Sequence, residues 1–331
     1  MRRIRAALPF LPSVLLFAAL AALLVSGLRQ PVRWAEKKYI LGYLSGSGQE
    51  VAPPYAPLSR VDVFEQGTDV RYNGHLYLIG SDAGGRDLLV LIAHGAVLSL
   101  ELVLLVVVLR LLIGIAVGVA MGLGSLRVRT FTTVMSRWVA GFPYLVLAIV
   151  LITALSTWSK FWAFVIAMAM VGWRDIAQLT SERVESILAQ PYAEAARALG
   201  GNRLGIFRRH VVPHLRPVLI IETSFQASAV LVLLGELGYL KFFLGAPFTF
   251  NQVLLPQPEL GALLSIARDY IISQQWAPVL APAGAIALIA LAFELLGLAL
   301  ASRDRSGRQG YVSRRAALRA REQDPAPERA A

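Results

Sequence analysis

The sequence predicts an all-α integral membrane protein with about six transmembrane helices. Three observations lead to this prediction. Hydrophobic residues make up 56% of the 331 residues and charged residues only 16%, whereas soluble domains are about 45–50% apolar and about 25% charged. The chain contains six apolar runs close to the roughly 20 residues that a helix needs to cross the hydrocarbon core. Its Lys and Arg residues are shared unevenly between alternate loops.

The six apolar runs are residues 8–28, 96–123, 131–155, 161–179, 218–237 and 279–301. We let the loops alternate between the two sides of the membrane. The side that holds both termini then has 21 of the 32 Lys and Arg residues, the other side has ten, and the remaining one, Arg110, lies within the second run. Because cytoplasmic loops are enriched in Lys and Arg, we expect both termini in the cytoplasm. The chain is therefore predicted to be a multi-pass protein of the cell (inner) membrane.

The first apolar run has a second interpretation. Three arginines precede a stretch rich in Leu and Ala that ends at Val25-Ser26-Gly27, and a cleaved signal peptide has the same pattern. Cleavage would leave five spans and would place the amino terminus outside. Retention and cleavage of this run both stay open.

The runs divide the chain into four regions. Residues 1–28 form a cytoplasmic amino terminus and the first span, and residues 88–301 form the transmembrane core. Residues 29–87 form an extracytoplasmic segment, where Gly and Pro break long helices and residues 61–64 indicate a short strand or an apolar contact. Residues 302–331 lack apolar periodicity, so we expect a basic cytoplasmic tail that is mostly solvated or disordered.

The loop between the fourth and fifth runs, residues 191–213, carries the most distinctive local pattern. An apolar helical face with i, i+3, i+4 and i+7 spacing is formed by Tyr192, Ala195, Ala196 and Leu199. Gly200 permits a turn, and a second helix from about residue 203 is expected to end at Pro213. The small side chains on this face allow a partner protein to approach closely. The spacing fits equally well a face that lies against the membrane surface.

The same loop carries a recognisable motif. Glu194-Ala195-Ala196, followed after three residues by Gly200 and then by Pro213, resembles the EAA loop of permease subunits from binding-protein-dependent ABC transporters. Two further stretches resemble the oligopeptide, dipeptide and nickel branch of these permeases. Residues 79–87 (IGSDAGGRD) look like its LGTDxxGRD motif, and residues 258–261 (PELG) look like its PEWG segment.

The resemblance covers residues 76–300 and has departures. Basic residues are usual in the branch at positions where this chain has Gln178 and Ser181, and the last run lacks the branch's Gly-Asp pair. These departures leave the fold unaffected, but they leave the class of solute open.

The resemblance implies an ABC importer permease for peptides or a related small solute. Its expected partners are separate ABC ATPase subunits, a second permease subunit in a homodimer or heterodimer, an extracytoplasmic solute-binding protein and the lipid bilayer. The motif assigns the role of a coupling helix, seated in a groove of the ATPase, to Glu194, Ala195, Ala196, Gly200 and Pro213.

The chain is not expected to hydrolyse ATP. A Walker A loop needs a lysine after glycine, and no lysine of this chain follows a glycine. ATP would therefore bind to the partner ATPase subunits. We expect no catalytic residues, no cofactor and no metal site in this chain, and no nucleic-acid partner.

Ionisable residues inside the apolar runs are the remaining candidates. Such groups are costly in a bilayer and mark a functional site by default. Arg110 is the clearest case, and either it forms an ion pair with Glu222 or Glu294 of another span, or it lines the solute pathway. The intramembrane carboxylates also keep an ion-coupled secondary transporter as an alternative, although we find no inverted repeats. An intramembrane hydrolase would need a nucleophile and a base, and no convincing pair is present.

Overall fold

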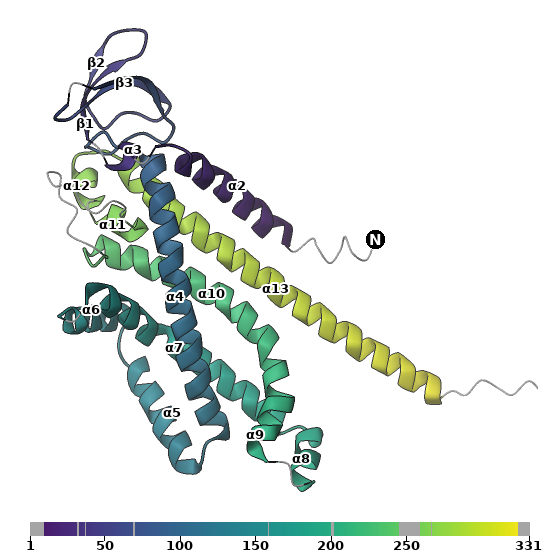
Figure 1. The fold of residues 1–331 in the computed structure, drawn as a ribbon. Helices are drawn as coiled ribbons and strands as arrows, with labels where there is room; N and C mark the ends of the chain where they lie inside the picture. The colour runs from purple at the N-terminus through teal and green to yellow at the C-terminus, as the bar shows by residue number, and fades with distance from the viewer. Residues whose placement is uncertain are drawn as a thin grey trace, which may run out of the picture.

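Long helices make up most of the computed structural model, which describes residues 10–31, 33–36, 38–68, 70–157, 159–199, 202–244, 259–265 and 267–323. In chain order the elements are α2 (Leu11–Leu28), α3 (Arg33–Glu36), β1 (Tyr39–Leu44), β2 (Glu50–Val51), β3 (Ser59–Glu65), β4 (Arg71–Tyr77), α4 (Leu88–Leu123), α5 (Leu126–Ala140), α6 (Tyr144–Leu155), α7 (Lys160–Leu188), α8 (Pro191–Ala198), α9 (Arg203–Ile206), the π-helix η2 (Phe207–Val211), α10 (Val212–Tyr239), α11 (Leu260–Leu264), α12 (Ala267–Ile272) and α13 (Ala277–Gln323). The β-sheet lies at one end of the helical body, and α8 and α9 lie at the other end (Figure 1).

The predicted count of six spans is not confirmed. Within the described ranges, α2, α4, α10 and α13 are long and apolar enough to cross a membrane. The pair α5 and α6 passes the same test as a unit, which raises the number to five. The fourth apolar run lies in α7, a helix of 29 residues that includes Arg174 and Asp175 and does not pass the test.

The third apolar run is broken, so the prediction of one continuous helix over residues 131–155 is wrong. α5 and α6 meet at 98°, with the bend at Gly141-Phe142-Pro143. Proline disfavours the helical conformation of the residue before it, which ends α5 ahead of the bend. α5 is also amphipathic, because Arg127, Arg129 and Arg137 interrupt its apolar residues.

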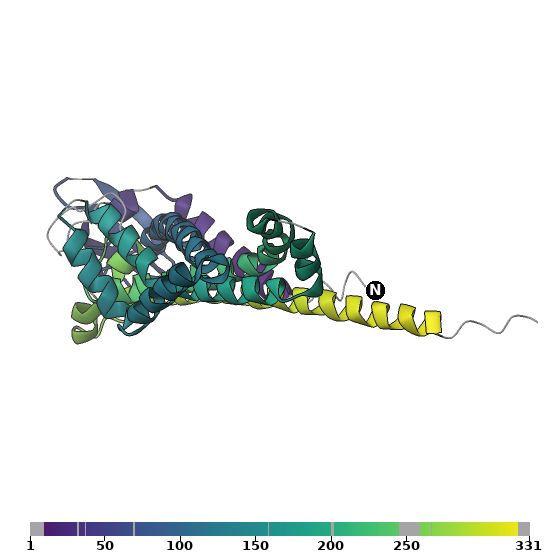
Figure 2. The same ribbon diagram turned by 90° about the horizontal axis from the view of Figure 1, so that it is seen from below.

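Residues 302–323, part of the tail expected to be mostly solvated or disordered, are helical. α13 continues as one helix from Ala277 to Gln323, and its end extends past the other helices (Figure 2). Ala and Arg are good helix formers. A segment that extends an existing helix also avoids the unfavourable nucleation step. Residues 324–331 lie outside the described residues.

The extracytoplasmic segment of the prediction contains a four-stranded antiparallel sheet in the order β2-β1-β3-β4. The strand expected at residues 61–64 is confirmed as part of β3. Buried aromatic rings pack at the base of the sheet, and Trp34 stacks on His75 with ring centroids 3.6 Å apart. The sheet and its aromatic cluster thus form a small folded cap at the beginning of α4.

The turn between β4 and α4 is fixed by two aspartates. Asp82 accepts a hydrogen bond from the Arg86 Nε at 2.6 Å and forms an ion pair with the same guanidinium. Asp87 caps α4, because its Oδ1 accepts from the Leu89 backbone N at 2.8 Å. The Asp87 Oδ2 lies 2.8 Å from His75 Nε2. One carboxylate therefore ties β4 to the first turn of α4.

A second joint connects α4 to α11. The Leu260 backbone N donates to Ser99 Oγ at 2.9 Å, across 161 residues of sequence. Glu259 is buried and caps α11 by accepting from the Gly261 N, while its other oxygen accepts from the Leu244 N at 3.0 Å. Burial raises the pKa of Glu259 to about 7. These contacts fix the segment after residue 258 against α4 and the end of α10.

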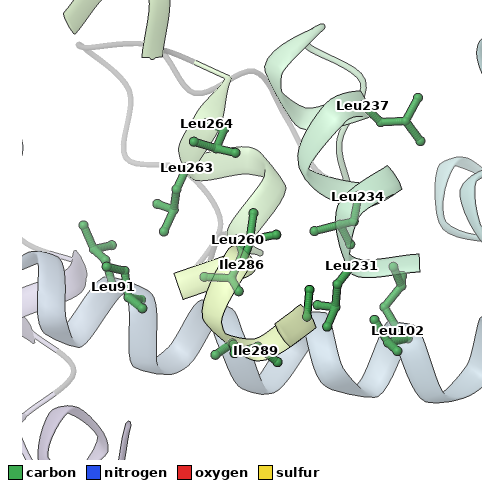
Figure 3. Close-up of a cluster of buried hydrophobic side chains, with 14 of the residues drawn as sticks. Leu91, Leu102, Leu231, Leu234, Leu237, Leu260, Leu263, Leu264, Ile286 and Ile289 are labelled. Carbon is green, nitrogen blue, oxygen red and sulfur yellow. The ribbon is translucent and has the colours of Figure 1, made fainter. Parts of the chain in front are cut away.

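The largest hydrophobic core lies where α4, α10, α11 and α13 meet. Leucine and isoleucine side chains from these four helices fill the space between them (Figure 3). The labelled side chains are Leu91 and Leu102 of α4, Leu231, Leu234 and Leu237 of α10, Leu260, Leu263 and Leu264 of α11, and Ile286 and Ile289 of α13. The side chains of this core pack beside the hydrogen bond between Ser99 and Leu260 and hold α4 against α11.

Glycines spaced four residues apart bring α4 against α7. A Cβ added at Gly118 would lie 2.5 Å from the Ala177 carbonyl oxygen and 2.6 Å from the Thr180 Cβ, and Gly114 and Gly122 make equally close approaches to α7. Small residues at this spacing allow two helix backbones to meet closely in a membrane. The glycine pattern therefore serves packing within this chain.

Gly118→Ala is expected to destabilise the protein by about 1–3 kcal/mol, because the new methyl group overpacks the α4–α7 interface. Gly284→Ala is the matched control, since no atom lies within 4 Å of a Cβ added there. That control is expected to be neutral or slightly stabilising, because Ala is the better helix former. The measurement is the thermal unfolding midpoint of both variants in detergent. Equal midpoints would contradict the packing role of Gly118.

Candidate functional site

Residues 191–213 form a bent unit between α7 and α10, which we call the elbow. Pro191 begins α8, a position where the missing N–H of proline costs nothing. α9 and η2 follow and lead directly into α10. Gly200, the predicted turn glycine, lies outside the described residues. The elbow and the β-sheet lie at opposite ends of the molecule (Figure 1).

Hydrophobic contacts anchor the elbow to the ends of α7 and α10. A separate buried cluster joins Val184 and Ile187 of α7 to Val211 and Leu215. Ala193 is also fully buried. This attachment fixes one side of the elbow to the helices that lead into the membrane.

The predicted apolar face of α8 is largely exposed. Glu194 and Ala195 are exposed, Ala196 is half-buried, and Leu199 is 89% exposed. The expectation that small side chains are displayed on the surface agrees with this placement. Nothing within the described part of the chain covers Leu199.

The prediction that a second helix ends at Pro213 is wrong. The helical path continues through η2 into α10, with Pro213 in the first turn of α10 and Pro217 inside it. In a regular α-helix the proline ring strikes the carbonyl four residues earlier. The wider π-turn at Phe207–Val211 comes just before Pro213 and relieves that clash. The elbow is therefore continuous with the fifth predicted span.

Two cavities border the elbow. The first, which we call the notch, has a volume of about 640 Å³ and is lined by Ala196, Leu199, Asn202, Gly205, Ile206, Arg208 and Arg209. The second has a volume of about 410 Å³ and is lined by residues that include Tyr192 and Pro213. The motif residues Ala196 and Pro213 thus border different cavities.

Arg110 lies inside the helical body and is only 3% exposed. Its Nε and Nη2 donate to the Met168 carbonyl oxygen of α7 at 3.0 and 2.9 Å, and its Nη1 donates to Gln226 Oε1 of α10 at 2.8 Å. Gln226 in turn donates to Glu222 Oε1 at 2.9 Å. Arg110 thus reaches the predicted partner Glu222 only through Gln226.

Arg110 and Glu294 face one cavity of about 390 Å³ within the helical body. Asp175, Glu236 and Tyr144 line it as well, and the Tyr144 hydroxyl donates to the Glu236 carboxylate at 2.9 Å. The described residues show no hydrogen bond between Arg110 and Glu294. Four apolar runs therefore contribute charged side chains to the same cavity.

Sequence reasoning missed two residues of this arrangement. Gln226 is the direct partner of Arg110, and it lies one helical turn from Glu222 in the sequence. Gly172 provides the space, because a Cβ there would lie 2.2 Å from the Arg110 Cζ. A polar residue four positions after Glu222 was a usable signal for Gln226. The sequence carried no comparable signal for Gly172.

No group of three His, Asp or Glu side chains in the described ranges is placed to hold a metal ion. The polar side chains around Arg110 form a hydrogen-bonded network beside a cavity.

The chain matches the family model of the binding-protein-dependent transport system inner membrane component over residues 111–306. This match includes the elbow and more than half of the chain. The chain belongs to this family. Membership makes it a membrane-spanning, non-enzymatic permease component of an ABC transporter, and it confirms the resemblance seen in the sequence.

Two relatives of this permease are similar to it over most of their length. The di/tripeptide transport system permease protein DppC of Pseudomonas aeruginosa (strain UCBPP-PA14) is 33% identical over 226 residues, which are 67% of this chain and 69% of the relative. The oligopeptide transport system permease protein OppC of Escherichia coli (strain K12) is 30% identical over 225 residues, 68% of this chain and 70% of the relative.

One solved structure, titled as an amino acid ABC transporter with histidines, is 20% identical with a TM-score of 0.44. It covers 65% of this permease and 94% of its own chain. A likeness at this level adds nothing to the assignment.

Proposed function

We propose that this permease translocates peptides or a related small solute into the cell. An extracytoplasmic binding protein delivers the solute, and separate ATPase subunits supply the energy. The observation that carries the proposal is the family match over residues 111–306. The names of the relatives DppC and OppC support peptides as the solute class.

In this proposal the ATPase docks on the elbow through Glu194, Ala195, Ala196, Gly200 and Pro213. Three features support the docking: the exposed face of α8, the notch beside it, and the anchor to α7 and α10. A movement of the ATPase would then pass to the spans as a rigid-body shift. ATP binds to the ATPase, and a second permease subunit completes the transmembrane unit.

The proposal also fixes the orientation in the inner membrane. The cap lies outside and faces the binding protein, and the elbow lies in the cytoplasm with both termini. The carboxyl end of α13 and the amino end of α2 point away from the sheet, which supports this orientation (Figure 1). The basic residues of the elbow and of α13 agree with the excess of positive charge on cytoplasmic segments.

Uptake by the purified importer in proteoliposomes tests this function. Labelled di- and tripeptides are expected to accumulate when ATP, the ATPase subunits and the binding protein are present. An ion-coupled secondary transporter, the alternative that intramembrane carboxylates support, would accumulate them with an ion gradient alone. Uptake by the permease alone under a proton or sodium gradient would contradict the proposal.

The absence of cysteine makes the orientation directly testable. Ser47→Cys places a thiol on the exposed turn of the cap, and Leu199→Cys places one on the elbow. A membrane-impermeant maleimide added to intact cells that express the permease without its ATPase subunits is expected to label only the first variant, and both after lysis. Labelling of the Leu199→Cys variant in intact cells would reverse the orientation.

A further inference from the structure

The notch of the elbow combines an apolar wall with a basic rim. Ala196, Leu199 and Ile206 line it with apolar side chains, while Arg208 and Arg209 are exposed on its edge. No ion pair or hydrogen bond of these two guanidinium groups is present among the described residues. Two unpaired cations beside an apolar hollow can be complemented by acidic groups on a partner.

The elbow as a whole is positively charged. Residues 191–213 contain four arginines and a single acidic residue, Glu194. Opposite charge on a partner would raise the rate of association and fix its position on the elbow. The charge therefore favours an acidic partner surface.

The shape of the notch favours a protein over a membrane surface. Asn202 Oδ1 accepts from the Gly205 N at 2.6 Å, which fixes the wall formed by the start of α9. The buried Ile206 and Val211 hold this wall against the rest of the chain. A concave volume of about 640 Å³ accommodates a protruding side chain, whereas a lipid surface presents no such protrusion.

We infer that the notch receives an apolar side chain of the ATPase subunit that is flanked by carboxylates, which pair with Arg208 and Arg209. The inference rests on the proposed function, since the ATPase is the partner assigned there to the elbow. It adds the chemistry of the matching surface: an apolar knob with acidic neighbours on the ATPase.

Co-purification of the co-expressed ATPase subunits with the full-length permease tests the inference. The variant Arg208→Glu/Arg209→Glu reverses the charge of the rim. The matched control Arg127→Glu/Arg216→Glu makes the same charge change at exposed positions outside the notch. The first variant is expected to retain about tenfold less ATPase at low salt, and the control to stay within about twofold of the wild type.

Salt dependence separates charge pairing from a shape effect. ATPase retained by the wild type is expected to fall as salt rises, because salt screens exposed charge pairs. Arg208→Leu/Arg209→Leu is expected to weaken this dependence. Retention of wild-type amounts of ATPase by the charge-reversal variant would overturn the inference. So would a defect that appears only in nanodiscs with anionic lipid while ATPase retention is unchanged, because the arginines would then bind lipid.

Ala196→Trp distinguishes failure of the inference from failure of the proposed function. If Ala196→Trp loses the ATPase and the charge-reversal variant keeps it, the elbow still docks the ATPase but the acidic partner surface is wrong. If both variants keep the ATPase, docking on the elbow itself is wrong. Monodisperse elution of each variant in detergent verifies that the permease remains folded.

Discussion

Ala196→Trp is expected to abolish ATP-driven uptake while the permease still inserts into the membrane. Ala196 is half-buried on α8 and lines the notch, so a tryptophan side chain there projects into the volume that the ATPase would enter. Residues buried in the anchor, such as Ala193 and Val211, are unaffected by the change. Uptake of a labelled tripeptide is expected to fall to background in proteoliposomes, and ATP hydrolysis is expected to lose its dependence on solute.

Ala196→Ser serves as the control, because it changes polarity but adds almost no volume. Its uptake is expected to stay close to that of the wild type. If Ala196→Trp supported normal uptake, the elbow would not be the coupling surface. If Ala196→Trp were absent from the membrane, the tryptophan would disturb packing of the permease itself, and the loss of uptake would not report on coupling.

Apolar length and charge distribution were sufficient to predict a helical membrane protein. They were insufficient at the third run, because the bend between α5 and α6 depends on Gly141-Phe142-Pro143 and not on apolar content. Composition also did not indicate that residues 302–323 continue α13 as a helix. A segment that continues a stable helix avoids the nucleation step, so it can be helical without an apolar face of its own. Apolar periodicity does not detect such a continuation.

The candidate site was also predicted only in part. Spacing placed Ala195, Ala196 and Leu199 on one face, and the structure leaves that face on the surface of the elbow. The end of the second helix at Pro213 was wrong, because a proline pattern does not reveal that a π-turn precedes it. The partner of Arg110 depends on how α4, α7 and α10 meet in space. Each helix can pack with many rotations about its own axis, and these rotations decide which side chains face each other. The sequence therefore did not predict that Arg110 contacts Gln226.

Arg110→Leu is expected to leave insertion intact and to lower uptake by more than about tenfold. The wild-type guanidinium joins α7 and α10 by donating to the Met168 carbonyl and to Gln226. Leucine leaves the Gln226 Oε1 without its donor in a buried site, at a cost of about 1–3 kcal/mol. The hydrogen bond between Gln226 and Glu222 then loses its support. The measurement is initial uptake rate per inserted permease in proteoliposomes, with ATPase content held equal.

Gly172→Ala tests whether position or charge is the essential property of Arg110. The new Cβ would lie 2.2 Å from the Arg110 Cζ, so the guanidinium must move although its charge is retained. If Arg110 acts by joining α7 to α10 in a fixed geometry, Gly172→Ala is expected to lose uptake almost as fully as Arg110→Leu. If Arg110 acts only as a positive charge facing Asp175 and Glu294 in the cavity, Gly172→Ala is expected to retain most of the activity. Wild-type uptake by Arg110→Leu would contradict both roles, because a buried arginine that can be removed without effect neither joins the helices nor lines the path.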